Sequence, residues 1–207
     1  METPETTFLE LAELAPIDRY KLLIGAVVPR PIGWIGSVDL EGRRNLAPYS
    51  FFNVVAATPP TVFFAPGHRR GRPKDTLANV MATGEFTVNV VDEALAEAMN
   101  LTSGEYGPEV DEAALAGLEM RPGRLVAAPY VVASPAVLEC KVVELVELGD
   151  PPTSTVVFGR ILGARIRSEL LAEGRVDPFG LRAVGRMAGA GYTRTVDGYF
   201  EMERPSV

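Results

Sequence analysis

The most constraining feature of this chain is a succession of short β-branched and aromatic segments separated by Gly- and Pro-rich breaks. A parallel sheet would need long helices between its strands, and the chain has no helical pattern of that length there. Short connections instead favour antiparallel pairing of successive strands. The pattern therefore predicts a mainly β (α+β) fold, a partly open antiparallel barrel with short added helices. We expect a single domain over residues 1–207, because no linker or internal repeat is apparent.

Turn residues and side-chain periodicity divide the chain into expected elements. Strands are expected at residues 32–38, 46–55, 61–65, 86–91, 137–146, 155–167 and 199–202. Helices are expected at residues 6–23, 75–84, 92–99 and 109–118. Pro16 should interrupt the first helical run, and Asp75 or Thr76 should cap the second helix. The Gly-rich tail at residues 178–191 should be irregular.

Composition limits the chemistry of the chain. Of its 207 residues 47% are hydrophobic, which excludes a disordered polymer, and its net charge of −7 argues against a nucleic-acid binder. Cys140 is the only cysteine and His68 the only histidine, so neither an intramolecular disulfide nor a zinc cluster is expected. The acidic start is unlike a secretory signal, and no apolar stretch has the length of a membrane span. We therefore expect a cytoplasmic protein.

Lys74, Asp75 and Thr76 lie where a helix is expected to begin. The first turn of a helix presents free backbone N–H groups and the positive end of the helix dipole, which favour a bound phosphate. The pattern has two interpretations: an ordinary capped helix with a solvated lysine, or a phosphate site. The preceding loop favours an anion because it adds three arginines, Arg69, Arg70 and Arg72.

Residues 45–53 form an unusual strand-like stretch in which aromatic side chains surround Ser50. These aromatic side chains, and Trp34 on the neighbouring segment, are typical either of a hydrophobic core or of a wall for a planar ring. Cys140 is expected to be buried and inert, and His68 to be solvated in the basic loop. The glycines at residues 189 and 191 lack the third glycine and the preceding strand of a dinucleotide-binding fingerprint.

Taken together, several segments resemble the flavin-reductase-like family of FMN-binding split-barrel proteins. The resemblance is strongest over residues 28–91, in PRPIGWIGSVDLEGRRNLAPYSFFNVV, TPPTVFFAP and KDTLANVMATGEFTVNVV. It continues through LECKVVEL, VFGRILGARI and VGRMAGAGY. It implies an antiparallel Greek-key split barrel that binds FMN noncovalently near a homodimer interface.

The resemblance also assigns expected cofactor contacts residue by residue. Arg30 is expected as a further anion contact, and no metal site is expected. The residues on the flavin-binding strand are Ala47, Pro48, Tyr49, Ser50, Phe51, Phe52 and Asn53; those at the phosphate are Lys74 and Thr76; those on the bordering strand are Trp34 and Ser37.

The family includes members that accept hydride from NADH or NADPH and pass it to FMN, and some of these deliver the reduced flavin to a separate monooxygenase or to ferric complexes. The protein's part in such chemistry is positional, so no catalytic side chain is assigned. Several of these reductases carry a C-terminal histidine associated with nicotinamide binding, whereas residues 186–192 of this chain read RMAGAGY. Three hypotheses follow: an NAD(P)H-dependent flavin oxidoreductase, an FMN-binding electron carrier or flavin store, and a cofactor-free interaction module.

Overall fold

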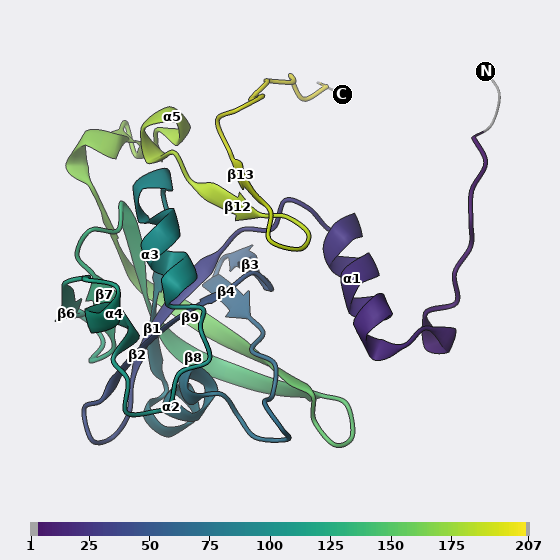
Figure 1. The fold of residues 1–207 in the computed structure, drawn as a ribbon. Helices are drawn as coiled ribbons and strands as arrows, with labels where there is room; N and C mark the ends of the chain where they lie inside the picture. Colours follow the sequence, from purple (N-terminus) through teal and green to yellow (C-terminus); the bar gives the residue numbers. More distant parts are fainter. Residues whose placement is uncertain (1–3, 206–207) are drawn as a thin grey trace.

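A computed structural model describes residues 4–205 and is built around one large antiparallel sheet (Figure 1). Its seven strands lie in the order β2-β1-β5-β8-β9-β4-β3. They are β1 (Gly33–Val38), β2 (Arg44–Tyr49), β3 (Phe52–Ala57), β4 (Pro60–Phe64), β5 (Glu85–Asn89), β8 (Ala136–Leu148) and β9 (Ser154–Ile166). The sheet confirms the predicted mainly β class.

The predicted strand at residues 46–55 is wrong in one respect: it is two strands. β2 ends at Tyr49 and β3 begins at Phe52, and these two strands form opposite edges of the sheet. Because only Ser50 and Phe51 separate them, and a residue spans at most about 3.6 Å, the two edges must approach each other. The sheet therefore curls into a barrel that stays open between β2 and β3. Each half pairs antiparallel as expected, β2 with β1 and β3 with β4.

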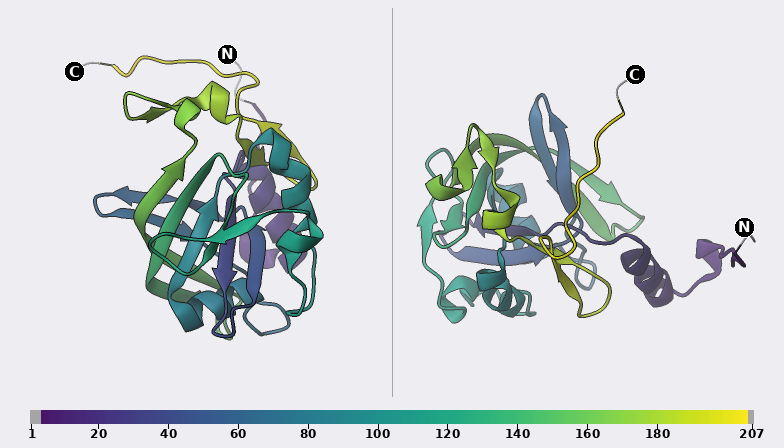
Figure 2. Two further views of the ribbon diagram at one scale, coloured as in Figure 1. Left: turned by 90° about the vertical axis from the view of Figure 1, so that its left-hand side faces the viewer. Right: turned by 90° about the horizontal axis from the view of Figure 1, so that it is seen from above.

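Most of the short elements pack around the barrel, whereas the N-terminal helix stands apart from it (Figure 2). The helices are α1 (Pro16–Ala26), α2 (Asp75–Thr83), α3 (Ala96–Leu101), α4 (Glu112–Leu115) and α5 (Pro178–Leu181). The 3-10 turns are η1 (Leu11–Glu13), η2 (Glu93–Leu95) and η3 (Ser168–Leu170). The two-stranded ribbons pair β6 (Met120–Pro122) with β7 (Pro129–Val131), β10 (Leu171–Ala172) with β11 (Arg175–Val176), and β12 (Val184–Arg186) with β13 (Tyr192–Arg194).

Both ends of the chain depart from the sequence predictions. Pro16 does not interrupt the first helix but begins it, because proline suits the first helical position, where its missing N–H has no partner to lose. The predicted strand at 199–202 is wrong, since those residues have no regular structure. Extended pairing occurs instead at β12 and β13, so the tail at 178–191 is also less irregular than expected.

The core has two parts, one on each face of β1. Trp34 and Ile35 are consecutive and fully buried, and because side chains alternate across a strand they point to opposite faces. Ile35 joins Phe64, Phe86 and other side chains inside the barrel. Trp34 packs outside it with Met99 and further residues from the covering segments. The strand is therefore buried on both faces.

Candidate functional site

A pocket of about 490 Å³ opens beside β2 and the start of α2. One wall is formed by Asn45, Ala47, Pro48 and Tyr49 of β2, and another by the segment 102–108 that follows α3. The remaining lining comes from the basic loop and the first turn of α2, at Arg69, Arg72, Pro73, Lys74, Asp75 and Thr76, and from Glu112. The structure thus brings the strand-like stretch and the helix start together on one pocket.

The basic end of the pocket depends on a tight turn. The backbones of Arg69 and Arg72 exchange two hydrogen bonds of 2.8 and 3.0 Å. The two residues between them, Arg70 and Gly71, both have positive φ, the conformation that a two-residue turn of this hand requires. The turn therefore places Arg69 and Arg72 side by side on the pocket, while Arg70 is not among the lining residues.

The start of α2 differs from the prediction in its cap. Lys74 is the N-cap residue, and no side chain caps the helix. Asp75 and Thr76 therefore occupy the first two helical positions instead of the cap. The backbone N–H groups of the first turn keep their capacity to bind an anion, because neither side chain consumes it. Lys74 is exposed at the pocket, whereas Thr76 is buried.

Four buried polar side chains form the floor between β2, α2 and α4. The Tyr49 hydroxyl donates to Thr76 Oγ1 at 2.9 Å, and Thr76 Oγ1 lies 2.7 Å from the amide of Asn45. With that amide oriented to satisfy both neighbours, its oxygen accepts from Thr76 and its nitrogen donates to Glu112 Oε1 at 3.2 Å. Glu112 Oε2 also accepts from the backbone N–H of Leu46 at 3.2 Å.

Burial raises the pKa values of two side chains in this floor, Tyr49 and Glu112. It raises the pKa of Tyr49 to about 12, so the phenol keeps its proton at neutral pH. Burial is also the main reason that the pKa of Glu112 is raised, and the nearby carboxylates of Asp75 and Asp111 add to the effect.

Two expected cofactor contacts lie behind the pocket wall. Trp34 is fully buried, and its indole N–H donates to Thr102 Oγ1 at 2.9 Å. Thr102 lines the pocket, so Trp34 supports the wall through it. Ser37 is also buried and accepts from Asn79 Nδ2 at 3.2 Å, on the far side of the wall.

Arg30 is a structural clamp. Its Nη1 donates to the carbonyl oxygens of Ile24 (2.7 Å) and Val27 (2.6 Å), and its Nη2 to that of Met187 (3.0 Å). Its Nε donates to Ser50 Oγ at 3.3 Å. The guanidinium thereby ties the end of α1 and the C-terminal segment to the bend between β2 and β3. Its anion contact remains a prediction.

The residues of the predicted flavin-binding strand that precede the bend line the pocket, and those that follow the bend do not. Ala47 and Pro48 line the pocket, whereas Phe51, Phe52 and Asn53 are not among its lining residues. Phe51 is 45% exposed, and Phe52 packs so closely on Gly33 that a Cβ there would lie 2.6 Å from its ring.

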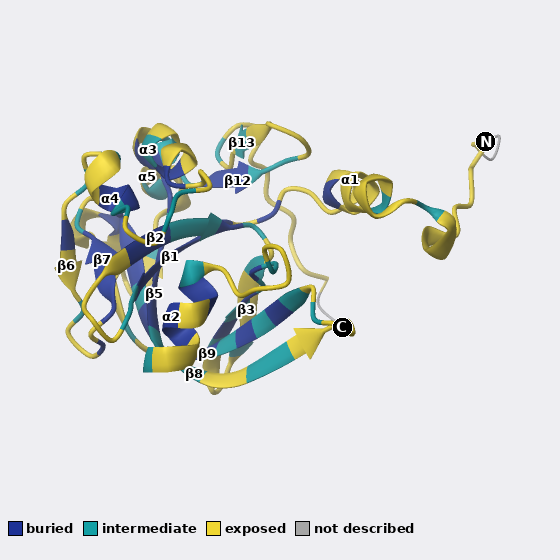
Figure 3. Cartoon of the chain, turned by 60° about the horizontal axis from the view of Figure 1, so that its bottom comes forward, coloured by how far each residue is buried: buried dark blue, intermediate teal, exposed yellow. Residues whose placement is uncertain are grey.

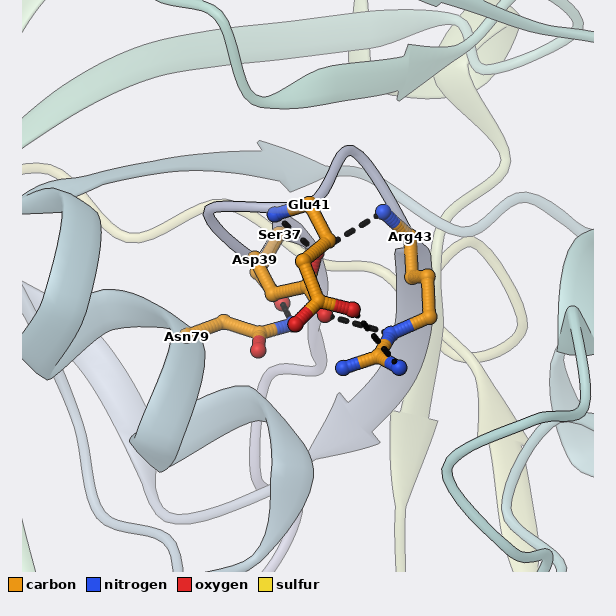
Figure 4. A network of polar contacts seen from close by, with 5 residues as sticks. All are labelled: Ser37, Asp39, Glu41, Arg43 and Asn79. Atoms are coloured by element: carbon orange, nitrogen blue, oxygen red, sulfur yellow. Dashed lines mark hydrogen bonds and ion pairs between the residues drawn. The ribbon is translucent and has the colours of Figure 1, made fainter.

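A second cavity of about 320 Å³ adjoins the first and shares Asn45, Asp75, Pro108 and Glu112 with it. Its rim is the β1–β2 turn, which Asp39 organises (Figure 4). Asp39 accepts from the backbone N–H groups of Glu41 and Arg43 and pairs with the Arg43 guanidinium at 2.6 Å. Although burial opposes the shift, these bonds from Arg43 and Glu41 lower the pKa of Asp39.

Several lining residues escaped the sequence reasoning, namely Asn45, Thr102, Ser103, Gly104, Glu105, Tyr106 and Glu112. Of these residues, only Asn45 could have been singled out from the sequence, because it is the polar residue at the start of the aromatic stretch. The others reach the pocket through tertiary packing of the 102–112 segment. That segment is held by ion pairs at both ends, Glu105 with Arg69 at 2.9 Å and Asp111 with Arg44.

The only histidine and the only cysteine of the sequence both lie outside the pocket lining. His68 is half-buried instead of solvated, because its Nε2 lies 2.9 Å from Thr155 Oγ1. Cys140 is buried as predicted, and burial raises its pKa to about 12. Within residues 4–205, no cluster of three His, Cys, Asp or Glu side chains is placed to hold a metal ion. No helix in that range is both long and apolar enough to cross a bilayer.

The chain is similar in sequence and in structure to several known proteins. Residues 24–180 match the family described as flavin reductase like domain. An uncharacterized protein of Deinococcus radiodurans is 43% identical over 207 residues, covering 96% of this chain and 89% of that protein. The structure of nitrilotriacetate monooxygenase component B from Bacillus cereus has a TM-score of 0.93 and 32% identity, covering 97% of this chain and 100% of the other. Pseudomonas fluorescens 2-nitrobenzoate 2-nitroreductase NbaA has a TM-score of 0.88 and 33% identity, with 97% of both chains covered.

Proposed function

The chain belongs to the flavin reductase-like family, and from this premise we propose that it is an NAD(P)H-dependent flavin oxidoreductase that binds FMN. The observation that carries the proposal is the pocket beside β2, where basic side chains and an uncapped helix start gather at one end of a largely uncharged wall. A flavin mononucleotide combines an anionic phosphate with a planar ring, so its two ends match the two ends of the pocket.

The phosphate would lie at the basic end. Arg72 and Lys74 line the pocket there, and within residues 4–205 neither forms an ion pair. Arg69 is paired with Glu105 and would bind an anion in competition with that carboxylate. The first-turn N–H groups of α2 supply backbone donors at the same end.

The ring and ribityl chain would follow β2, where Ala47, Pro48 and Tyr49 line the pocket. Ser50, Phe51, Phe52 and Asn53 continue that segment past the bend. Arg30, Trp34 and Ser37 would act from behind, as supports for Ser50, Thr102 and Asn79.

Bound FMN would supply the redox chemistry, accepting hydride from NADH or NADPH and passing electrons on. The residues of the chain would bind and orient the flavin, and no acid or base is assigned among them. The name of the Bacillus cereus neighbour, a monooxygenase component B, supports a partner monooxygenase as the electron acceptor.

We also propose that the protein is a homodimer. The amphipathic helix α1 stands apart from the barrel (Figure 3), and Ile24 is its only buried residue. Ile17, Tyr20 and Leu23 are 56%, 52% and 44% exposed, an apolar surface that a second copy would cover.

An FMN-binding electron carrier or flavin store without its own nicotinamide site is the alternative, favoured by the lack of histidine in residues 186–192. In the structure the start of this segment forms β12, and Arg186 lies over the ring of Tyr192 at 4.5 Å. Anaerobic addition of NADH or NADPH to the FMN-loaded protein separates the two. Bleaching of the flavin absorbance is expected; no bleaching with either donor, even with excess FMN, would leave only the carrier. Failure of the protein to bind any flavin would leave the cofactor-free module.

The phosphate end is tested by charge removal. We expect Arg72→Ala with Lys74→Ala to weaken FMN binding roughly tenfold or more, since each supplies a charged donor. Riboflavin, which lacks the phosphate, should bind as before. Arg70→Ala is the matched control, because Arg70 lies in the same turn but does not line the pocket. Equal loss of both ligands, measured by fluorescence titration, would show that the phosphate lies elsewhere.

A further inference from the structure

The floor of the pocket contains a carboxyl group that the proposed function does not use. Glu112 comes from α4, Asn45 and Tyr49 from β2, and Thr76 from α2, and all four line the pocket. None is more than 9% exposed. The four side chains form one hydrogen-bonded series, Tyr49–Thr76–Asn45–Glu112. Because buried donors and acceptors must be matched, the direction of each bond depends on the next.

With Glu112 ionised, the direction of the series is determined. A carboxylate only accepts, so Asn45 must donate its N–H to Glu112 and present its oxygen to Thr76. The single hydroxyl proton of Thr76 then goes to Asn45. Tyr49 gives its own proton to Thr76 Oγ1. Neither hydroxyl retains a proton to donate into the pocket, where a phosphate oxygen would need one.

With Glu112 protonated, the series reverses between the same atoms. The carboxyl proton is donated to the Asn45 oxygen, while Glu112 Oε2 still accepts from the Leu46 N–H. The Asn45 amide, turned over, donates to Thr76 Oγ1 at 2.7 Å. Thr76 then has its hydroxyl proton free to donate into the pocket. Only the amide of Asn45 has to rotate, and in doing so it gives up the 3.2 Å hydrogen bond that its oxygen accepts from the Leu46 N–H, which keeps Glu112 Oε2 as its partner.

We propose that Glu112, acting through Asn45, determines whether Thr76 donates or accepts at the phosphate end of the pocket, so that binding of a flavin phosphate takes up one proton. The proposal rests on the proposed function, because it needs the phosphate near Thr76. Glu112 is thus a positioning residue, and its protonation favours FMN over riboflavin.

The charges around Glu112 support protonation when an anion binds. Asp75 faces it from α2 and Asp111 from its own helix, where Arg44 of β2 pairs with Asp111. The pocket adds Arg69, Arg72, Lys74 and Glu105, and the adjoining cavity adds Asp39, Glu41 and Arg43. Burial and the two aspartates raise the pKa of Glu112. A phosphate would add negative charge nearby and so favour the protonated form further.

The test is titration of the flavin-free full-length protein with FMN and with riboflavin, between about pH 5 and about pH 9, a range that spans the second ionisation of a phosphate monoester near about pH 6. Glu112→Gln keeps a permanent donor toward Asn45 and so imitates the protonated carboxyl. We expect it to bind FMN about tenfold more tightly than the wild type at the alkaline end, a factor typical of one hydrogen bond to a charged group. The two proteins should converge at the acid end, and riboflavin should bind both equally.

Two further variants separate the relay from simple charge removal. Glu109→Gln removes an equal charge from an exposed residue of the same segment, and it should keep the wild-type pH profile. Asn45→Ala removes the link but leaves the Glu112 charge in place. We expect a smaller pH dependence than in the wild type, because Thr76 then has a free hydroxyl proton at every pH and only the repulsion between the Glu112 charge and the phosphate remains. FMN binding at the alkaline end should lie between that of the wild type and that of Glu112→Gln. Circular dichroism checks that each variant is folded.

The outcomes also separate this inference from the proposed function. If Glu112→Gln follows the wild type at every pH, or if Asn45→Ala keeps the wild-type linkage, the relay is wrong. The proposed function would then still stand, provided that FMN binds more tightly than riboflavin and that this preference depends on Arg72 and Lys74. If the wild-type protein shows no preference for FMN over riboflavin, both proposals are overturned.

Discussion

At the scale of single residues, several buried polar contacts lie behind the pocket wall. Trp34 is the clearest case, because its indole N–H is fully buried and has Thr102 as its partner. Thr102 in turn donates to the Met99 carbonyl at 2.8 Å, so one hydroxyl serves both a core side chain and the turn that ends α3. Thr102 therefore both lines the pocket and stabilises the fold.

Thr102→Val should lower the free energy of unfolding by about 1–3 kcal/mol, because it leaves the buried indole N–H unpaired. Thr102→Ser is the matched control, since it keeps the hydroxyl and loses only a methyl group. Denaturant unfolding followed by the fluorescence of Trp34, the only tryptophan, measures both variants. A Val variant as stable as the wild type would contradict the assigned hydrogen bond.

Cys140 gives a pH dependence with a definite sign. Its pKa is raised from 9.0 to about 12 in the folded protein, mainly by burial and secondly by Glu139. The unfolded chain therefore ionises first, and this contribution to stability is present below pH 9 and is lost as pH rises toward 12. We expect a thiol reagent at about pH 8 to react only after unfolding. Prompt reaction of the native protein would contradict the burial.

At the scale of elements, close approaches determine how strands and coverings pack. Gly36 of β1 lies under the β6–β7 ribbon, where an added Cβ would be 2.2 Å from the Pro129 carbonyl oxygen. Backbone cannot move aside as a flexible side chain can. Thr87 of the neighbouring β5 donates to that same carbonyl at 2.6 Å, which holds the ribbon against the sheet.

Gly36→Ala should therefore destabilise the fold by about 1–3 kcal/mol or more through overpacking. Gly25→Ala in α1 is the control, because nothing lies within 4 Å of the added Cβ, and its stability should be unchanged or slightly higher. Thermal unfolding of the two variants under identical conditions compares them. Similar melting temperatures would show that β7 does not lie against β1 as described.

The C-terminal ribbon is attached through Glu93 of η2. Its carboxylate pairs with Arg182 at 2.9 Å and with Arg194 at 3.2 Å, on either side of β12. The hydrogen bond from Arg182 is the main cause of the lowered pKa of Glu93. A lowered pKa means that this attachment is present at neutral pH and is lost as pH falls through the folded-state value.

Glu93→Gln should speed hydrogen exchange of the amides at residues 183–194, after correction for intrinsic rates, and the wild type should approach it at acid pH. Glu97→Gln is the control: Glu97 lies in the adjacent helix, is exposed, and forms no ion pair within residues 4–205. Unchanged exchange in Glu93→Gln would show that the backbone pairing of Asp92 with Ala183 is sufficient to hold the ribbon.

At the scale of the whole molecule, the main question is what covers α1. Figures 1 and 3 show it beside the barrel, with most of its surface exposed. The apolar side chains of an amphipathic helix stabilise it most where another surface covers them. The proposed homodimer would cover it, and Arg30 would then link the buried helix to the bend at Ser50.

Ile17→Glu with Tyr20→Glu should convert the protein to monomers, because it places charge on the proposed contact. Lys21→Ala, on the same helix and largely exposed, should leave the assembly unchanged. Sedimentation velocity over a range of concentrations gives the mass of each. A wild-type protein that sediments as a monomer throughout would contradict the homodimer.

The mainly β class and the partly open antiparallel barrel were predictable from the sequence because strand patterns and turn residues act locally. The paired segments at β1, β4, β5, β8 and β9 follow directly from alternating β-branched side chains. The division of residues 46–55 was not predictable, since no local signal marks Ser50 and Phe51 as the place where the chain changes edges. The prediction for the C-terminal end was wrong for a related reason. β12 and β13 pair because the C-terminal segment packs on η2 and on the turn at Arg30, which are distant in the sequence.

The candidate site divides in the same way. The basic character of one end of the pocket was predictable, because the basic turn and the start of α2 are contiguous in the chain. The sequence also placed Ala47, Pro48 and Tyr49 on the facing strand. In contrast, only the folded chain shows that residues 102–108 and Glu112 complete the pocket, and that Trp34 and Ser37 lie behind its wall. The physical reason is that a helix start or a turn is local, whereas a buried hydrogen-bonded floor joins elements that only the closed barrel brings together.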